Sequence, residues 1–429
     1  MSKVLDSTYL AEAVSGFTPR TAMEEAARCL LCHDAPCSKG CPAGTDPGKF
    51  IRSIRFRNVK GAAETIRENN ILGGSCARVC PYDRLCEEYC SRCGIDRPIQ
   101  IGKLQRFAIE QEKLFGMNIL ESSADKKSKK VACIGGGPAS LAVAAKLAQE
   151  GYAVTIYEAN AKAGGMCSYG ITPARLPQEV IDHDIAQVEK LGVKFIYNTK
   201  VGKDIKFDDL KKDFDAVFVG VGLWAPKVPN IPGKDLKGVY SAVDYLKSAR
   251  ESDGKSNIGK KVIVIGGGDV AMDCASTAKL LGAEGAIWYR RTIGEAPANM
   301  AEIQYVTELG VPMTNNFAPK EIVGNAKGEV EYMVFSGREG HLDGAEAKVT
   351  ADTVVFAIGQ APEDVAGIAP VKVNEKGGIV VENNCVTNID GVFACGDITN
   401  GGKTVVEAVA AGKVAAFEIA SYLEAKEGK

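Results

Sequence analysis

The sequence predicts an α/β protein in which an all-helical, cysteine-rich N-terminal domain precedes two Rossmann-like nucleotide-binding domains. Nine of the fourteen cysteines lie between Cys29 and Cys93. Further along the chain, two strand-like runs each lead into three consecutive glycines, which begin at Gly135 and Gly266. Around these glycines, short β-branched runs alternate with helical segments, a pattern typical of βαβ units and a parallel sheet.

The composition is that of an ordinary globular protein. The chain has 429 residues, of which 45% are hydrophobic and 25% are charged, and its formal net charge is −2. This charge gives no broad attraction for nucleic acid or anionic lipid, and no apolar run has the length of a signal peptide or membrane span. We therefore expect a cytoplasmic protein without nucleic-acid or membrane partners. In that compartment, fourteen cysteines favour metal or redox chemistry over disulfides.

The domain boundaries follow from changes in pattern. Good helix formers with apolar residues three and four apart predict helices at Thr21–Leu31 and Gly102–Phe115. The polar, charged stretch at residues 122–130 is typical of a linker. The predicted division is a helical domain at 1–121, the linker at 122–130, a discontinuous first nucleotide-binding domain at 131–227 and 361–429, and a second one at 228–360.

The first glycine-rich turn has the full context of a dinucleotide site. The strand Lys130–Ile134 leads into Gly135-x-Gly137-x-x-Ser140, which opens a helix. The first glycine makes the tight turn, the second admits a pyrophosphate to the helix N-terminus, and the third position takes a small residue. A second strand, Ala153–Tyr157, ends at Glu158, where an acid binds ribose hydroxyls. An empty glycine-rich turn is the alternative interpretation, and this context disfavours it.

The second turn differs at the ribose position. The strand Lys261–Ile265 leads into Gly266-x-Gly268-x-x-Ala271, and the next strand, Ala286–Tyr289, ends in Arg290 and Arg291 instead of an acid. A basic pair suits the 2′-phosphate of NADP(H). A solvated basic edge is the alternative interpretation.

Two dinucleotide modules in one chain suggest a flavin held beside a nicotinamide. The C-terminal pattern supports this: a strand ends in Gly396–Asp397, and Thr404–Phe417 reads as a helix. A carboxylate at a strand end can bind a ribityl hydroxyl, while the helix N-terminus faces the flavin ring. Simple helix capping by Asp397 is the alternative.

The cysteine spacing favours iron–sulfur clusters. Disulfides disagree with the compartment. The Cys29-x-x-Cys32-His33 stretch matches a haem-attachment pattern but leaves seven neighbouring cysteines unexplained. Zinc prefers more widely separated pairs. Tight runs that end in Cys–Pro, such as Cys41–Pro42, occur in ferredoxins. Nine cysteines suffice for two 4Fe–4S clusters, and the spacing does not identify the spare one. The histidines add little: His33 lies beside a predicted ligand, and His183 and His341 read as surface residues.

These motifs carry a resemblance that covers nearly the whole chain. Residues 27–32, 34–37, 41–42, 101–107 and 175–177 resemble the N-terminal half of dihydropyrimidine dehydrogenase. They are still more similar to the separate NAD-dependent subunit of the bacterial enzymes. The glutamate synthase small subunit and a subunit of the electron-bifurcating transhydrogenase share the plan. The resemblance implies nucleotide-binding domains of the glutathione/thioredoxin-reductase type.

The resemblance also implies the ligands of two 4Fe–4S clusters. One cluster would be held by Cys29, Cys32, Cys37 and Cys90, and the other by Cys41, Cys80, Cys86 and Gln105. Cys76 and Cys93 would then be spare. From the residues alone, Gln105 is a polar residue on a helix, and Cys93 stays open as its substitute.

The remaining site residues are likewise implied by the resemblance. For FAD they are Gly135, Gly136, Gly137, Pro138, Ala139, Glu158, Gly164, Gly165, Met166, Arg175, Val201, Gly396, Asp397, Thr404 and Val405. For the nicotinamide cofactor they are Gly267, Gly268, Asp269, Val270, Arg290, Arg291, Ala357, Ile358 and Gly359. The basic pair favours NADPH, whereas the family name favours NADH, so the coenzyme preference stays open.

The expected activity is that of an electron-input subunit. It would oxidise NAD(P)H with FAD and pass single electrons through two 4Fe–4S clusters, without a proton-transfer catalyst of its own. The resemblance places the pyrimidine site, with FMN and further clusters, on a partner subunit, which implies a hetero-oligomer that reduces uracil or thymine in pyrimidine degradation. The alternatives keep the electron-transfer role and change the partner: a glutamate synthase large subunit or a bifurcating transhydrogenase complex.

Overall fold

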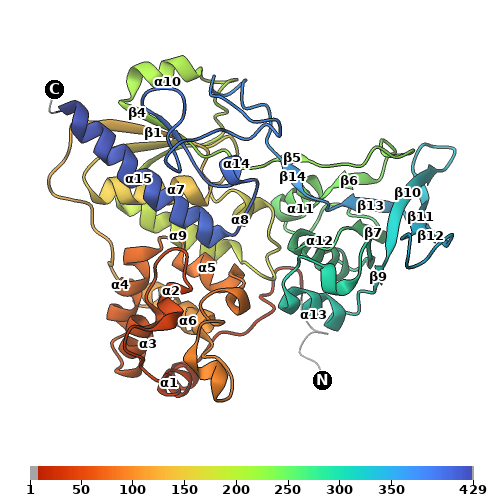
Figure 1. Ribbon diagram of the computed structural model, residues 1–429, viewed down its shortest axis with the longest axis horizontal. Helices are drawn as coiled ribbons and strands as arrows, with labels where there is room; N and C mark the ends of the chain where they lie inside the picture. Colours follow the sequence, from red (N-terminus) through yellow and green to blue (C-terminus); the bar gives the residue numbers. More distant parts are fainter. Residues whose placement is uncertain (1–7, 428–429) are drawn as a thin grey trace. The chain divides into compact units, whose positions relative to one another are not determined.

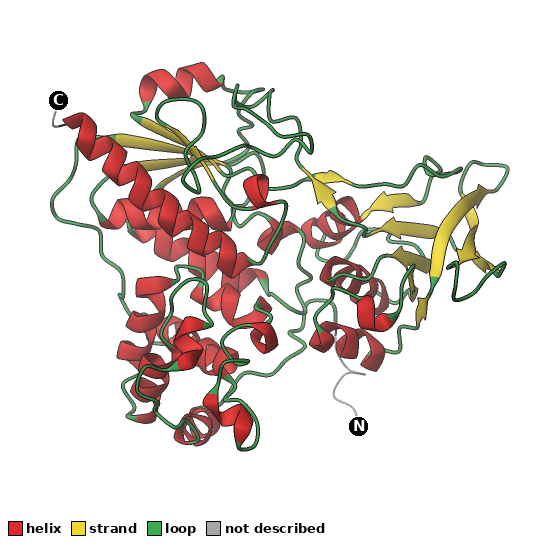
Figure 2. Cartoon of the chain, in the orientation of Figure 1, coloured by secondary structure: helices red, strands yellow, loops and turns green. Residues whose placement is uncertain are grey.

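A computed structural model describes residues 8–427 of the chain, which form two compact units. The larger unit comprises residues 14–168, 178–223 and 362–427, and the smaller one comprises residues 8–13, 169–177 and 224–361. Figure 1 follows the chain by colour, and Figure 2 distinguishes the helices from the strands. The cysteine-rich segment and the first nucleotide-binding region, predicted above as separate domains, belong to the same unit.

The larger unit contains a five-stranded parallel sheet of order β15-β4-β1-β2-β3. In its central strand, residues 131–134 are apolar and buried, as is usual in a parallel sheet covered on both faces. The strands are β1 (Lys130–Ile134), β2 (Ala153–Tyr157), β3 (Lys194–Ile196), β4 (Ala216–Val219) and β15 (Val392–Ala394). The helices of this region are α7 (Pro138–Gln149), α8 (Met166–Tyr169), α9 (Gln178–Lys190), α10 (Phe207–Asp213), α14 (Asp397–Asn400) and α15 (Val405–Glu427).

The C-terminal helix α15 packs along α7 (Figure 1). The close approach depends on Gly412, because a Cβ at this position would lie 2.5 Å from the carbonyl oxygen of Ala139. The sequence pattern predicted this helix only as far as Phe417, whereas it extends to Glu427. The contact between α7 and α15 joins the glycine-rich turn to the end of the chain.

The cysteine-rich part of the larger unit is helical, apart from the loops that carry most of the thiols. Its elements are α1 (Pro19–Ala27), α2 (Pro36–Lys39), α3 (Pro47–Arg55), α4 (Val59–Asn69), α5 (Gly73–Val79), η1 (Tyr82–Arg84), η2 (Ser91–Gly94) and α6 (Ile101–Leu114). Phe50, Ile54 and Phe107 lie at the centre of its apolar core. The partly buried thiols of Cys29, Cys37, Cys86 and Cys90 pack against this core.

The smaller unit repeats the βαβ plan. Its parallel sheet has the order β6-β13-β7-β8-β9, and a three-stranded antiparallel sheet, β10-β11-β12, adds to it. The strands are β5 (Ala225–Pro226), β6 (Val239–Ser241), β7 (Lys261–Ile265), β8 (Glu284–Tyr289), β9 (Met313–Asn315), β10 (Phe317–Gly324), β11 (Val330–Gly337), β12 (Glu346–Thr350), β13 (Thr353–Phe356) and β14 (Gln360–Ala361). The helices are α11 (Ala242–Glu251), α12 (Asp269–Leu280), η3 (Ile293–Glu295) and α13 (Met300–Glu308).

Two sequence-based expectations are wrong in detail. The first helix ends at Ala27 instead of reaching Leu31, because Leu31 has a φ of +52°, which no right-handed helix tolerates. His183 does not lie at the surface, since its side chain is only 15% exposed. His33 and His341 are exposed as expected. Within residues 8–427, no helix has the length and apolar character needed to cross a bilayer.

Candidate nucleotide and cluster sites

The first glycine-rich turn is tightly built. Gly135 has a φ of +90°, and a Cβ there would lie 2.8 Å from the carbonyl oxygen of Gly220. Gly137 caps α7 without a side-chain hydrogen bond, the first turn of α7 holds no acidic residue, and the space beside Gly137 is open. An uncapped helix N-terminus with open space in front of it suits a pyrophosphate. Ser140, at the third position of the motif, is fully buried.

The structure brings several predicted FAD residues to this turn. The Gly164 N–H donates to the carbonyl oxygen of Gly136 at 2.8 Å. A Cβ on Gly165 would lie 3.1 Å from the Gly137 Cα, and one on Gly396 would lie 3.1 Å from the Ala139 Cβ. Three parts of the chain therefore meet at the start of α7: the glycine-rich turn itself, the segment that begins at Gly164, and the end of β15.

Glu158 lies at the end of β2 and is 5% exposed. Its Oε2 accepts the Gly136 N–H at 2.7 Å, and its Oε1 accepts the backbone and side-chain N–H groups of Asn160 at 2.8 and 2.9 Å. The segment that leads to the buried Val201 passes close by, because the Thr199 N–H donates to the Glu158 carbonyl oxygen at 2.9 Å. A carboxylate has about four acceptor sites, so one remains for a ribose hydroxyl.

Asp397 is the first residue of α14 and is mostly buried, and burial raises the pKa of its carboxyl. Its Oδ1 accepts the Lys403 N–H at 3.0 Å, so the side chain holds the loop before α15. Thr404 caps α15 by exchanging hydrogen bonds with Glu407, and Val405 is the first residue of the helix. Within the protein itself, Asp397 therefore fixes the loop that precedes α15. Its contact with a ribityl chain stays a prediction.

The second turn, in the smaller unit, is built similarly, except that the helix after it, α12, begins with the acidic Asp269. A Cβ on Gly266 would lie 2.3 Å from the Ala357 carbonyl oxygen, so this turn abuts the predicted segment Ala357–Gly359. Gly267 lies against the ring of Tyr289, and Gly268 caps α12 without a side-chain hydrogen bond. The Asp269 carboxylate accepts the Asn299 N–H at 2.7 Å, and Val270 is 37% exposed. These features suit a second dinucleotide.

Arg290 and Arg291 follow β8 and are exposed. Within the part of the chain that the structure describes, neither guanidinium pairs with a carboxylate. Both side chains are therefore available to an anionic ligand, as the NADP(H) interpretation requires.

Arg175 lies in the smaller unit. Its guanidinium contacts Asp273 at 2.8 Å and Glu302 at 2.9 Å. The pKa of Glu302 is raised to about 7, chiefly by burial, while Arg175 opposes the rise. Contact between Arg175 and a flavin stays a prediction.

The thiols of the cysteine-rich part fall into two groups, which Cys86 links because it has both Cys41 and Cys37 as neighbours. The pKa of Cys37 is raised to about 12, first by burial and then by the nearby Cys90 and Cys29, and the pKa of Cys29 is raised by burial, with Cys90 and Cys32 as neighbours. In the second group, the pKa of Cys80 is raised by a hydrogen bond with Cys76, by burial and by the neighbouring Cys86 and Cys41.

The grouped side chains are thiols, which are the donors that iron–sulfur clusters use. Around one zinc ion all ligands meet a common centre, whereas a 4Fe–4S cube binds each thiolate to a different iron and so tolerates a wider spacing. The donor set therefore fits iron–sulfur clusters. Iron binding would have to displace the thiol protons that burial retains.

Three further candidates surround these groups. Cys76 is buried beside Cys80, as expected for residues four apart on and just after α5. Cys93 is exposed, and its Sγ lies 3.5 Å from the Glu87 carbonyl oxygen. The Gln105 Nε2 donates to the Gly73 carbonyl oxygen at 2.8 Å, which leaves the side-chain oxygen of Gln105 as a possible ligand.

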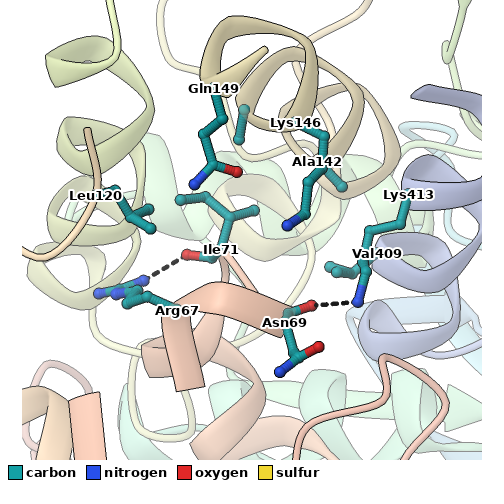
Figure 3. A pocket seen from close by; sticks show the side chains of 10 residues that line it. Arg67, Asn69, Ile71, Leu120, Ala142, Lys146, Gln149, Val409 and Lys413 are labelled. Atoms are coloured by element: carbon teal, nitrogen blue, oxygen red, sulfur yellow. Dashed lines mark hydrogen bonds between the residues drawn. The ribbon is translucent and has the colours of Figure 1, made fainter. Parts of the chain in front are cut away.

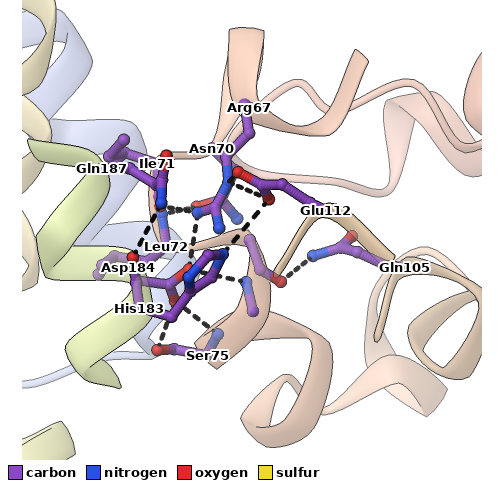
Figure 4. A network of polar contacts seen from close by, with 12 residues as sticks. Arg67, Asn70, Ile71, Leu72, Ser75, Gln105, Glu112, His183, Asp184 and Gln187 are labelled. Atoms are coloured by element: carbon purple, nitrogen blue, oxygen red, sulfur yellow. Dashed lines mark hydrogen bonds and ion pairs between the residues drawn. The ribbon is translucent and has the colours of Figure 1, made fainter. Parts of the chain in front are cut away.

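A buried polar network holds α5, the helix that carries Cys76 and ends before Cys80 (Figure 4). Arg67 is fully buried between Glu112, at 2.9 Å, and Asp184, at 2.6 Å. Asp184, on α9, also accepts the backbone N–H and the hydroxyl of Ser75, both at 2.8 Å. The helix α9 thus caps the N-terminus of a cysteine-bearing helix. No sequence motif marks this network, because its members are up to 117 residues apart.

His183 completes the network. Its Nε2 lies 3.8 Å from Glu112. Burial alone would raise the pKa of Glu112, but His183 and Arg67 together hold it below its usual value. The Arg67 guanidinium thus has a carboxylate partner on each side.

Two glycine-rich turns in parallel sheets and a set of grouped thiols define an NAD(P)H-dependent oxidoreductase with an iron–sulfur domain. Comparison with family models agrees: residues 129–412 match the pyridine nucleotide-disulphide oxidoreductase family, and residues 6–116 match the 4Fe-4S cluster domain II of dihydropyrimidine dehydrogenase. These matches support FAD, NAD(P)H and a 4Fe–4S cluster as cofactors.

Individual relatives extend the match to the whole chain. The NAD-dependent dihydropyrimidine dehydrogenase subunit PreT of Escherichia coli O157:H7 is 46% identical over 97% of this chain and 98% of its own. The glutamate synthase [NADPH] small chain of E. coli K12 is 32% identical over 96% of this chain and 94% of its own. The chain therefore belongs to the pyridine nucleotide-disulphide oxidoreductase family, in the branch that includes these two kinds of subunit.

Solved structures support the fold. FprA of Mycobacterium tuberculosis, determined in complex with NADPH, superposes with a TM-score of 0.58 at 20% identity and covers 70% of this chain and 86% of its own. The predicted α/β fold class is confirmed.

Proposed function

We propose that this chain is the electron-input subunit of a pyrimidine-reducing enzyme. It oxidises NAD(P)H and delivers single electrons, through two 4Fe–4S clusters, to a partner subunit that reduces uracil or thymine to 5,6-dihydropyrimidines. The observation that carries this proposal is the presence of two thiol groups in the same compact unit as the first dinucleotide turn. The 46% identity to a subunit named for this activity supports the choice of substrate.

The chain's own residues have binding roles in this function. The N-terminus of α7 and Glu158 would hold the pyrophosphate and the ribose of FAD, and Asp397 would hold its ribityl chain. The N-terminus of α12 would hold the second pyrophosphate, with Arg290 and Arg291 at a 2′-phosphate. A bound flavin takes two electrons together as a hydride and can release them singly. No side chain is needed as a proton-transfer catalyst.

The 32% identity to a glutamate synthase small chain favours one alternative, in which the same electron-input role serves a different partner. Mixing the chain with candidate partner subunits separates the two functions, because only the correct pair turns over uracil with NAD(P)H. Glutamate formation with a glutamate synthase large subunit, without any uracil reduction, would select the alternative.

The central test is anaerobic reduction of the purified chain. We expect NADPH or NADH to bleach a flavin absorption band and to support dye reduction, but not uracil reduction, in the absence of a partner. Metal analysis should find about eight irons per chain, the number in two cubes. Zinc in place of iron, or a flavin band that neither coenzyme bleaches, would defeat the proposal.

The fourth ligand of the second cluster gives a sharper prediction. We expect Gln105→Leu to lower the iron content from about eight to about four per chain, because it removes the only ligand proposed from α6. Cys76→Ser and Cys93→Ser are matched variants that should retain about eight irons. Loss of iron in either serine variant, with full occupancy in Gln105→Leu, would move the ligand role to that cysteine.

Coenzyme preference depends on the basic pair. We expect the double replacement of Arg290 and Arg291 by serine to raise the KM for NADPH about 10- to 100-fold, since a hydrogen bond to a charged group contributes about 1.5–3 kcal/mol. The KM for NADH should not change. Lys279→Ser, an exposed charge on α12, is the control. An unchanged KM for both coenzymes would indicate that the pair is a solvated edge.

A further inference from the structure

The half-buried Lys413 is the strongest feature that the proposed function leaves unexplained. It follows Gly412, whose missing side chain allows α15 to pack closely on α7. Its Nζ donates to the carbonyl oxygen of Ala43 at 2.6 Å and to that of Asn69 at 3.0 Å. Ala43 lies two residues after Cys41, so α15 is tied directly to the backbone of a predicted cluster-binding turn.

Within residues 8–427 no carboxylate lies at ion-pair distance from the Lys413 ammonium, since both of its hydrogen bonds go to carbonyl oxygens, although the Glu68 carboxylate acts on it from farther away. Figure 3 shows this ammonium beside Asn69 in a small pocket that Lys146 also borders. Burial and the charge of Lys146 lower the pKa of Lys413, while Cys41 and Glu68 oppose this effect. A partly buried cation without a carboxylate partner is costly unless another negative group lies nearby. The Cys41 thiol is close enough to interact with it electrostatically.

We propose that the Lys413 ammonium sets the reduction potential of the iron–sulfur cluster that includes Cys41. This inference rests on the proposed function, because it requires that cluster. Each electron that enters a cluster adds negative charge, and a nearby cation stabilises the reduced form. Lys413 is thus a tuning residue on the C-terminal helix. In the other thiol group, the cation that acts on Cys29 is Arg55 of α3, so the two clusters would have separate charged neighbours.

The test is a redox titration of both clusters by electron paramagnetic resonance, with the Cys41 signal identified by its loss in Cys41→Ser. Lys413→Gln keeps donors for the two carbonyl oxygens and removes the charge. We expect it to weaken reduction of the Cys41 cluster about tenfold, a fall of about 59 mV for one electron. The other cluster should not shift. Lys413→Arg should keep the wild-type potential, and Lys146→Gln, which removes a neighbouring charge without a thiol neighbour, should change it much less.

A second variant covers the case in which Lys413→Gln loses iron. Gln149 lines the same pocket, and Gln149→Glu would add a carboxylate to that pocket, with an expected fall in potential in the same direction. Unchanged potentials in every variant that retains its iron would overturn the inference, as would equal shifts of both clusters. If the wild-type chain holds no iron–sulfur cluster at all, the proposed function itself fails, which is a distinguishable result.

Discussion

Replacing Arg67 with methionine is expected to destabilise the cysteine-rich part of the larger unit by about 3–5 kcal/mol, the usual cost of removing one partner from a buried ion pair. The guanidinium lies between two carboxylates, and all three side chains are fully buried. Without the guanidinium, the carboxylates of Glu112 and Asp184 stay buried but lose their shared cationic partner. The methionine side chain fills a similar volume, so the loss of stability comes from desolvated charge and not from poorer packing.

Hydrogen exchange of the α4 and α6 amides measures this effect locally. We expect opening free energies in these helices to fall by about 3–5 kcal/mol, with loss of iron from the cluster that includes Cys80. The fluorescence of Trp224 and Trp288 provides an internal reference, because both tryptophans lie in the smaller unit. Their unfolding transition should be unchanged.

The chain offers a matched control that joins α6 to α9. Lys113 on α6 and Glu179 on α9 form an ion pair at 3.0 Å, but their side chains are 47% and 72% exposed. An exposed ion pair contributes about 0–1 kcal/mol. We therefore expect Lys113→Met to change the opening free energies measured by hydrogen exchange very little. Similar effects from the two variants would show that the buried network contributes no more than surface charge.

The contrast between these two pairs explains what the sequence could and could not predict. The strands at Lys130–Ile134 and Lys261–Ile265 were predicted residue by residue, because a short apolar run before three glycines has few other interpretations. No local sequence pattern predicts the pairing of Arg67 with Asp184. Nothing in a local pattern distinguishes a buried arginine from the many exposed ones.

Tertiary contacts also decided the elements that were mispredicted. The helical pattern from Thr21 onward continues to Leu31, but the chain leaves the helix after Ala27, and the Arg28 side chain contacts Glu25 and Asp96. The loop that results carries the predicted ligands Cys29 and Cys32. Lys413 was missed for a related reason: the long side chain of a helical lysine usually reaches solvent, whereas the packing at Gly412 brings this one to Ala43.

Replacing Glu158 with alanine is expected to weaken FAD binding about 100-fold, so that the chain purifies largely without flavin. The loss of the acceptor for a ribose hydroxyl accounts for this factor, because a hydrogen bond to a charged group contributes about 1.5–3 kcal/mol, or about 10- to 150-fold in affinity. The variant also removes the partner of the buried Gly136 N–H, which Glu158 binds at 2.7 Å, and this second loss weakens the turn with or without FAD. Glu158→Gln retains one acceptor oxygen and should have an intermediate affinity.

Flavin absorbance per chain and titration of the apoprotein with FAD measure this effect. Glu189→Ala, an exposed carboxylate on α9, serves as the control for a general change in charge. Iron content should stay at the wild-type value in Glu158→Ala, because the grouped thiols lie on other elements than β2, and this separates loss of flavin from unfolding. If Glu158→Ala binds FAD as tightly as the wild type, the carboxylate serves only to shape the glycine turn through Gly136, and the ribose must be held by another group.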